Sequence, residues 1–211
     1  MDDKVLKVAL VLEQEELVPY KASEGSAGVD LRASASCLIY PGQTVLVPTG
    51  MRMAIPNGYH LEIRPRSGLS LKTRLRVVNS PGTIDSDYRD EVKIILQNQF
   101  SQSEIPSLLL SSSPLFDRFG PIKDKISVEK FLQLEGQNID PMLEKSLLFV
   151  KEESIYLDEN GNPWGTENVE AGERIAQAIL SYTPEWQFDL VEDFSNYIED
   201  RGGGFGHSGV K

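Results

Sequence analysis

Cysteine is nearly absent from this chain of 211 residues, which contains only Cys37. A single thiol cannot form a disulfide within the chain, and such sparse use of cysteine is typical of a reducing compartment. No apolar run approaches the ~18 residues that a membrane-spanning helix needs. The first residues, Met-Asp-Asp-Lys, are acidic where a secretory signal would be basic. We therefore expect a cytoplasmic protein that does not contact a membrane.

Positive charge is also scarce, because 21 Lys and Arg residues face 32 Asp and Glu residues and the net charge is −11. Nucleic-acid binding depends on neutralising phosphates with Lys and Arg, so this balance argues against nucleic acid as a partner. The segment from Arg64 to Arg76 is nevertheless basic and contains no acid. It suits a small, highly charged anion, although a solvated strand face explains it equally well.

Strand-like apolar runs dominate the first hundred residues. With 40% hydrophobic and 25% charged residues, the chain has the composition of an ordinary globular protein. Pro-Gly and Asn-Gly steps separate the runs every ~8–12 residues, which is typical of an antiparallel all-β sandwich or barrel. The expected strands are Val5–Leu12, Leu38–Tyr40, Thr44–Val47, Met51–Ile55, Tyr59–Ile63, Arg174–Tyr182 and Gln187–Glu192.

Residues 101–165 interrupt this pattern with apolar residues at helical spacing. The stretch is too apolar for a disordered linker, so we expect a small folded excursion from one connection of the β domain. The predicted elements are a helix through Ile126, Phe131, Leu132 and Leu134, a second helix over Pro141–Val150, and a hairpin from Ile155–Leu157 that turns at Asn160-Gly161 before Trp164.

Residues 79–91 carry the most chemistry for their length. Apolar runs enter at Val77-Val78 and leave from Val92, so the segment is predicted to be the tip of a β-hairpin. Turn formers alone would suffice there. The segment also carries an amide, two carboxylates and an aromatic ring, and these can hold a nucleobase, activate a water and pack against a sugar. An acidic turn without function is the alternative. The residues are Asn79, Asp85, Asp87 and Tyr88.

The chain ends on a glycine-rich segment, Arg-Gly-Gly-Gly-Phe-Gly-His-Ser-Gly, that starts at Arg201. Such an ending is by default a mobile tail, because it has no pattern that would form a core. Glycines also let backbone N–H groups close around phosphate oxygens, and Phe205 can lie on a base. A tail that becomes ordered on a nucleotide is therefore the second interpretation.

Five segments carry a specific combination of motifs. They are 27–33 (Ala-Gly-Val-Asp-Leu-Arg-Ala), 65–72 (Pro-Arg-Ser-Gly-Leu-Ser-Leu-Lys), 82–89 (Gly-Thr-Ile-Asp-Ser-Asp-Tyr-Arg), 172–177 (Gly-Glu-Arg-Ile-Ala-Gln) and the glycine-rich tail. Together they resemble the trimeric-type deoxyuridine triphosphatases (dUTPases). The resemblance implies an all-β, distorted jelly-roll barrel of the β-clip type with a small mixed α/β insertion. The implied parts are a barrel core (1–100 and 166–200), an inserted subdomain (101–165) and a flexible arm (201–211) that closes the active site.

The resemblance implies hydrolysis of dUTP to dUMP and pyrophosphate, which limits uracil in DNA and supplies dUMP for thymidylate synthesis. Asp85 matches the general base that positions a water against the α-phosphorus. Mg²⁺ on the triphosphate is the implied cofactor, with Asp30 as an outer-shell anchor through water. The substrate-binding residues carried over are Arg66, Ser67, Gly68, Asn79, Gly82, Thr83, Ile84, Tyr88, Lys93, Gln177, Arg201, Phe205, Gly206, His207 and Ser208.

Roles follow from the same resemblance. Asn79, with backbone groups of the hairpin, is expected to tell uracil from cytosine, and Tyr88 is expected to pack beneath the deoxyribose. In this family the tail of one subunit completes a site formed by the others, so a homotrimer is implied. Arg174 is expected to make a structural ion pair, and capping a turn is an alternative role for Asp30.

Three departures from the family pattern stand out. Asp90 replaces the usual glycine after Tyr-Arg, the tail is one residue shorter between Arg201 and Phe205, and residues 101–165 are inserted between the third and fourth motifs. The insertion leaves both motifs intact, so hydrolysis should survive it. It either helps to pack subunits or binds a protein partner. The competing functions are a dCTP deaminase of the same fold, which needs a base beside C4 of cytosine, and a nucleotide-binding regulatory protein.

Overall fold

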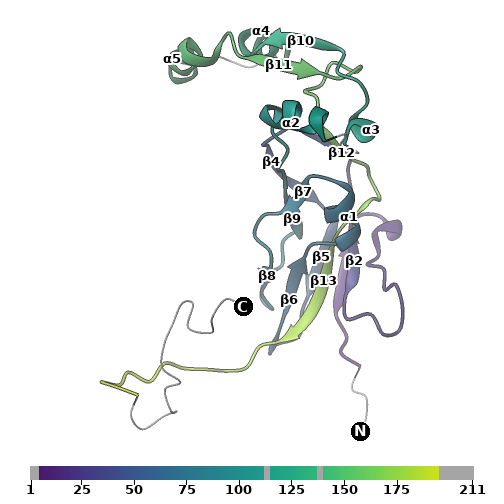
Figure 1. Cartoon of the computed structure of the whole chain (residues 1–211). Coiled ribbons are helices and arrows are strands. Elements are labelled where there is room, and N and C mark those ends of the chain that lie inside the picture. Colours follow the sequence, from purple (N-terminus) through teal and green to yellow (C-terminus); the bar gives the residue numbers. More distant parts are fainter. Residues whose placement is uncertain (1–4, 112–114, 137–139, 195–211) are drawn as a thin grey trace, which may run out of the picture.

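The computed structural model describes residues 5–111, 115–136 and 140–194. Short antiparallel strands build the main body, shown in the lower part of Figure 1. Their bounds are β1 (Ala9–Leu12), β2 (Val29–Arg32), β3 (Cys37–Ile39), β4 (Thr44–Pro48), β5 (Met51–Ala54), β6 (Tyr59–Arg64), β7 (Leu75–Val77), β8 (Gly82–Ile84), β9 (Lys93–Asn98), β12 (Glu167–Val169) and β13 (Arg174–Tyr182).

Two larger sheets and two strand pairs enclose one apolar core. The larger sheets have the orders β2-β13-β6-β8 and β4-β9-β7, and the pairs are β1-β5 and β12-β3. Alternate residues of each strand face inward, as the pleat requires, so that Ile63, Ile94 and Ile175 are buried while their neighbours along each strand are more exposed. The expected all-β architecture with a mixed insertion is confirmed.

Most of the predicted strands are present, and one is wrong. β4, β6 and β13 lie where turn signals and apolar runs placed them, whereas β1 begins only at Ala9. The alternating segment Gln187–Glu192 is not a strand: Phe188 and Leu190 are 83% and 96% exposed. Alternation makes a stable strand only where a ladder partner and a surface to cover are available, and no described strand pairs with this segment.

The predicted hairpin over residues 79–91 is confirmed in part. β7 and β9 pair antiparallel, with Val77 opposite Leu96, as the two apolar runs indicated. The connection is more than a tip, however, because it contains β8, and β8 pairs with β6 in the other sheet. The chain between the two arms of the hairpin therefore bridges two sheets and is held at both.

Residues 101–165 contain helices and a strand pair at the end of the molecule away from β6 and β13 (Figure 1). Ile126, predicted to be helical, lies on a strand instead, because Ser127 caps the following helix by accepting a hydrogen bond from the Lys130 amide. No helix among the described residues is long and apolar enough to cross a bilayer. The elements are α2 (Ile105–Leu110), α3 (Leu115–Phe119), β10 (Asp124–Ser127), α4 (Val128–Leu134), α5 (Pro141–Val150) and β11 (Ser154–Leu157).

The predicted turn at Asn160-Gly161 also forms, and it brings Pro163 against Leu157. The longer partner of β11 is β10, with Ile126 opposite Ile155. Trp164 follows the turn and is fully buried. The hairpin is therefore shorter than its sequence suggested, and the chain leaves it directly into an aromatic cluster.

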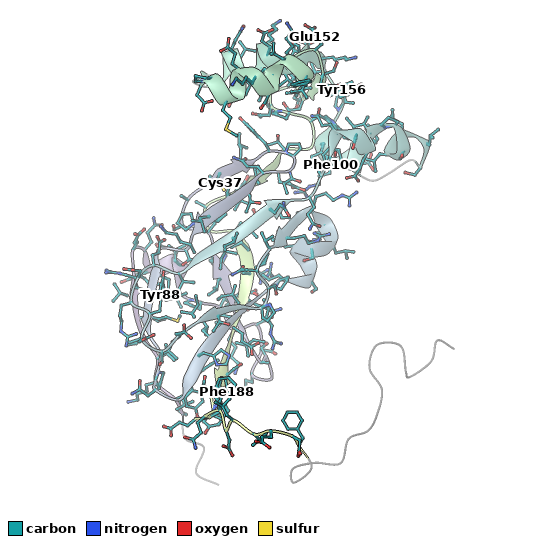
Figure 2. The ribbon with its side chains drawn as sticks, turned by 90° about the vertical axis from the view of Figure 1, so that its left-hand side faces the viewer. Cys37, Tyr88, Phe100, Glu152, Tyr156 and Phe188 are labelled. Atoms are coloured by element: carbon teal, nitrogen blue, oxygen red, sulfur yellow. The ribbon has the colours of Figure 1, made fainter. Side chains whose placement is uncertain are left out.

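An aromatic cluster joins the insertion to the barrel, and Figure 2 shows Phe100 at this junction. Ring centroids of Trp164 lie 5.5 Å from Phe100, 4.8 Å from Phe116 and 5.4 Å from Phe119. The buried Asn98 amide donates to the carbonyls of Ile39 and Gly165, at 2.9 and 2.8 Å. Both ends of the insertion are thus tied to one point of the barrel.

Gly165→Ala should unfold the protein more readily. Gly165 has φ +96°, and a Cβ there would lie 2.1 Å from the Phe100 ring, so the cluster would have to shift. We expect a loss of about 2–4 kcal/mol in the free energy of unfolding. Gly161→Ala is the matched control, because its φ is +81° and open space surrounds it. Equal midpoints of denaturant unfolding for both variants would contradict the packing argument.

Candidate active site

Asp30 and two arginines form the centre of a first polar group. Asp30 lies on β2 opposite Gln177 of β13. Its carboxylate accepts a hydrogen bond from Arg66 Nε at 2.7 Å and from Arg174 Nη1 at 3.0 Å. The expected ion pair of Arg174 is confirmed, with Asp30 as its partner. The Asp30 side chain therefore binds two guanidinium groups, and it does not cap a turn.

A polar cavity of about 450 Å³ opens beside this group. Arg66 and Gly68 line it together with Lys72 and Arg174. Ser67 begins α1 (Ser67–Lys72), directly between the two matched residues. Gln177 donates to the Pro65 carbonyl at 2.8 Å and so holds the loop that carries Arg66. We call this space the phosphate cavity, because cations and backbone N–H groups at its wall suit an anion.

A second cavity, of about 610 Å³, lies at the bridging segment. Figure 2 shows Tyr88 on this side of the barrel. We call this space the hairpin cavity, and it gathers matched residues from β8, the turn after it and β9. They are Asn79, Thr83, Ile84, Asp85, Tyr88 and Lys93, with Leu46, Asp90, Glu91 and Ile95 completing the wall.

Backbone contacts hold the hairpin cavity in shape. The Tyr88 amide donates to the Asp85 carbonyl at 3.2 Å, and the Tyr88 hydroxyl donates to the Glu91 carbonyl at 3.0 Å. Glu91 in turn accepts from the Gly50 amide at 2.8 Å and lies 3.5 Å from the Lys93 ammonium. Glu91 was not anticipated from the sequence, where it looks like any acid at a strand start.

Gly82 is required by close packing inside the same segment. A Cβ at Gly82 would lie 3.0 Å from the Asn79 side-chain nitrogen. The residue therefore serves the site by leaving room for the amide of Asn79. Asp90 lines the cavity, so the departure from the family pattern at this position adds a carboxylate to the wall.

The two cavities share no lining residue among those described. Within one chain, the residues matched to phosphate binding and those matched to base, sugar and water binding thus form two separate groups. The tail residues Arg201, Phe205, Gly206, His207 and Ser208 lie outside the described residues.

Electrostatics around the site favour fixed charges over an activated thiol. Burial raises the pKa of the Cys37 thiol, which makes it a poor nucleophile at neutral pH. Glu62 lies opposite Thr83 on β6, and the hydrogen bond from the Arg64 guanidinium lowers the pKa of its carboxyl group. Glu62 is therefore fully ionised at neutral pH beside the strand that enters the hairpin cavity.

Mg²⁺ fits this donor set only through water. Among the residues that the structure describes, no three His, Cys, Asp or Glu side chains gather into a direct metal site. Each Asp30 oxygen accepts one guanidinium N–H and keeps a second lone pair. Since Mg²⁺ keeps several of its waters, Asp30 can accept a hydrogen bond from one of them.

Comparison with known proteins decides the family. A family model described as dUTPase matches residues 14–105. The deoxyuridine 5'-triphosphate nucleotidohydrolase of Caulobacter vibrioides is 32% identical over 197 residues, which cover 92% of this chain and 86% of that protein. The chain belongs to the dUTPase family. The corresponding protein of Chlamydia felis is 57% identical over 89 residues, or 41% of this chain, and the chain spans 60% of its length.

Solved dUTPase structures share the fold. A mutant dUTPase of Staphylococcus bacteriophage 80alpha, with dUpNHpp, has a TM-score of 0.66 at 22% identity and covers 98% of this chain and 100% of that one. The dUTPase of phage phi11 of S. aureus, in which a species-specific insert is visualised, has a TM-score of 0.61 at 20% identity, covering 91% of this chain and 100% of that one. The distorted jelly roll implied by the sequence motifs is thus the fold of this family member.

Proposed function

We propose that this protein hydrolyses dUTP to dUMP and pyrophosphate. The observation that carries the proposal is the hairpin cavity, where Asn79, Asp85 and Tyr88 line one space although nine residues of chain separate the first from the last. A structural acidic turn has no need of an amide, a carboxylate and an aromatic ring at one wall. The family membership of the chain supports the same reaction.

The hairpin cavity would hold the nucleoside and the attacking water. The Asn79 amide and backbone groups of β8 would read the uracil edge, and the Tyr88 ring would pack against the sugar. A 2′-hydroxyl would clash there or lose its water. Asp85 would accept the proton of the water that attacks the α-phosphorus. Because an aspartate is a weak base, we infer that it acts chiefly by orienting this water.

The phosphate cavity would hold the triphosphate. Arg66 would supply charge, Ser67 a hydroxyl and Gly68 a backbone N–H close to the bond that breaks. Gln177 would act through the loop that it fixes. Bound Mg²⁺ would neutralise phosphate charge, and a structure of the phi11 dUTPase contains a coordinated Mg(II) ion. Asp30 would hold one of the waters of the metal while it keeps Arg66 and Arg174 oriented.

A homotrimer with shared sites is part of the proposal. One chain presents the two cavities apart, so a complete site needs one from each of two copies. Residues 201–211 would then close over the nucleotide, with Phe205 on the uracil and Arg201, His207 and Ser208 at the outer phosphates. The competing dCTP deaminase would need a base beside C4 of cytosine, and the comparisons do not favour it.

A protein partner for residues 101–165 is also retained as a proposal. Supporting observations are the exposure of Met142 and Phe149 on α5 and the apolar character of that helix. Phage 80alpha dUTPases are described as controlling the transfer of virulence genes. A regulatory role would be added to hydrolysis, since every matched catalytic residue is present in the sequence.

The proposed reaction is tested by pyrophosphate release from dUTP, dCTP, dTTP and UTP with Mg²⁺. We expect dUTP to exceed each of the others by at least about a hundredfold in kcat/KM, because mismatched hydrogen bonds to the base cost ~1–3 kcal/mol each. UTP isolates the contribution of Tyr88 to sugar selection. Ammonia release from dCTP, or no turnover of dUTP, would overturn the proposed function.

A further inference from the structure

The phosphate cavity has a cation that belongs to none of the family motifs. Arg118 of α3, a residue of the insertion, lines the cavity together with Arg66, Lys72 and Arg174. Glu173 is the only acid at the same wall among the described lining residues. Four cations against one acid make this a surface for a strongly anionic group rather than a neutral one.

The aromatic cluster fixes the position of Arg118. Its neighbour Phe119 packs on Phe100 and Trp164, with centroid distances of 5.7 and 5.4 Å. Trp164 Nε1 donates to the Gly120 carbonyl at 2.9 Å, which anchors the end of α3. The guanidinium of Arg118 therefore projects from a short, buried hinge of the insertion and is held against the barrel.

A buried carboxylate orients the guanidinium. Glu167 of β12 is 1% exposed and accepts from Arg118 Nε at 3.0 Å and also from Arg118 Nη2. Its other oxygen accepts from the Arg74 amide at 2.9 Å. A guanidinium has five N–H donors, so Glu167 uses two and leaves donors that an incoming anion can engage. About a third of the Arg118 side chain is exposed, which makes it reachable.

We propose that the insertion supplies Arg118 as a substrate-binding residue for the outer phosphates of the nucleotide. The inference rests on the proposed function, because it places the triphosphate along Arg66 and Gly68. Lys72, Thr73 and Arg118 continue the same wall beyond them. Residues 101–165 therefore contribute to the active site as well as to the surface, and affinity for the triphosphate depends on how the insertion is seated.

The alternative is that Arg118 is only a structural ion pair for Glu167. Replacing Arg118 alone would leave a buried carboxylate without its partner and could unfold the junction. The informative variant is therefore Arg118→Gln combined with Glu167→Gln, which removes both charges and keeps a neutral hydrogen-bonding pair. Arg74→Gln is the matched control, because Arg74 pairs with Glu104 of the insertion at 2.9 Å and does not line the cavity.

The test compares dUTP, inorganic tripolyphosphate and dUMP. We expect the double variant to raise KM for dUTP about tenfold, with kcat within about twofold of the wild type, as the loss of one charge-assisted contact predicts. Tripolyphosphate binding by calorimetry should weaken by a similar factor, and dUMP inhibition should stay unchanged. Arg74→Gln should leave all three constants unchanged.

Three outcomes decide the matter. A wild-type KM and wild-type tripolyphosphate affinity in the double variant would overturn the inference and leave dUTP hydrolysis intact. Equal weakening of dUMP and tripolyphosphate would also overturn it, because that pattern reports a general disturbance. If the wild type does not hydrolyse dUTP, the proposed function fails, and calorimetry with tripolyphosphate still shows whether Arg118 binds polyphosphate.

Discussion

Asp85→Asn should lower kcat for dUTP about a thousandfold, with KM changed only a few-fold. The amide has the shape of the carboxylate but cannot take a proton from the attacking water. The turn itself should survive, because the hydrogen bond from the Tyr88 amide goes to the backbone carbonyl of residue 85. Steady-state pyrophosphate release gives both constants, and calorimetry with dUpNHpp checks that the nucleotide still binds.

Asp87→Asn is the control for this substitution. Asp87 belongs to the same turn and carries the same charge, but it is not among the residues that line the hairpin cavity. Its variant should retain turnover within about twofold, since a surface charge change is nearly neutral. A kcat for Asp85→Asn within a few-fold of the wild type would show that the base has been assigned to the wrong residue.

Two inactive variants should restore activity when they assemble together. Asp85→Asn damages the hairpin cavity, and Arg66→Gln damages the phosphate cavity, so each homo-oligomer should be nearly inactive. If every site takes one cavity from each of two copies, an equal mixture contains intact sites wherever an Arg66→Gln chain supplies the hairpin and an Asp85→Asn chain supplies the phosphate wall. Random assembly gives about one quarter of wild-type turnover.

The control mixture combines two variants of the same cavity, Asp85→Asn and Asn79→Ala. No arrangement of these chains builds an intact hairpin cavity, so the mixture should stay as inactive as its parts. The chains are co-expressed with different tags and the mixed species is purified, which ensures that subunits have exchanged. Recovery no greater than in the control mixture would show that one chain supplies both cavities of a site, and the shared-site proposal would fail.

The arrangement around Glu167 also bears on how the insertion coexists with catalysis. The inserted residues enter after Phe100 and leave before Glu167, and both positions are fully or almost fully buried. The insertion therefore joins the barrel through packed contacts rather than through a flexible linker. Anything that shifts α3 would move Arg118 relative to the phosphate cavity.

Much of the site was visible in the sequence because it depends on local chemistry. Pro-Gly and Asn-Gly steps fix turns, and alternation fixes the buried face of β4, β6 and β13, since both depend on neighbours within a few residues. The matched residues Asn79, Asp85 and Tyr88 come from one continuous segment, and the structure gathers them into one cavity. The ion pair of Arg174 followed from its position beside Gln177 on the same strand.

Contacts between distant segments were decided only by the tertiary structure. No local spacing shows that β8 leaves its hairpin to pair with β6, that Ile126 belongs to a strand, or that the alternation of Gln187–Glu192 lacks a partner. Nor does it show that the matched residues divide between two cavities. Arg118 lies far from every motif in the sequence, and only the packing of its neighbours on Trp164 and its pairing with the buried Glu167 bring its charge to the phosphate cavity.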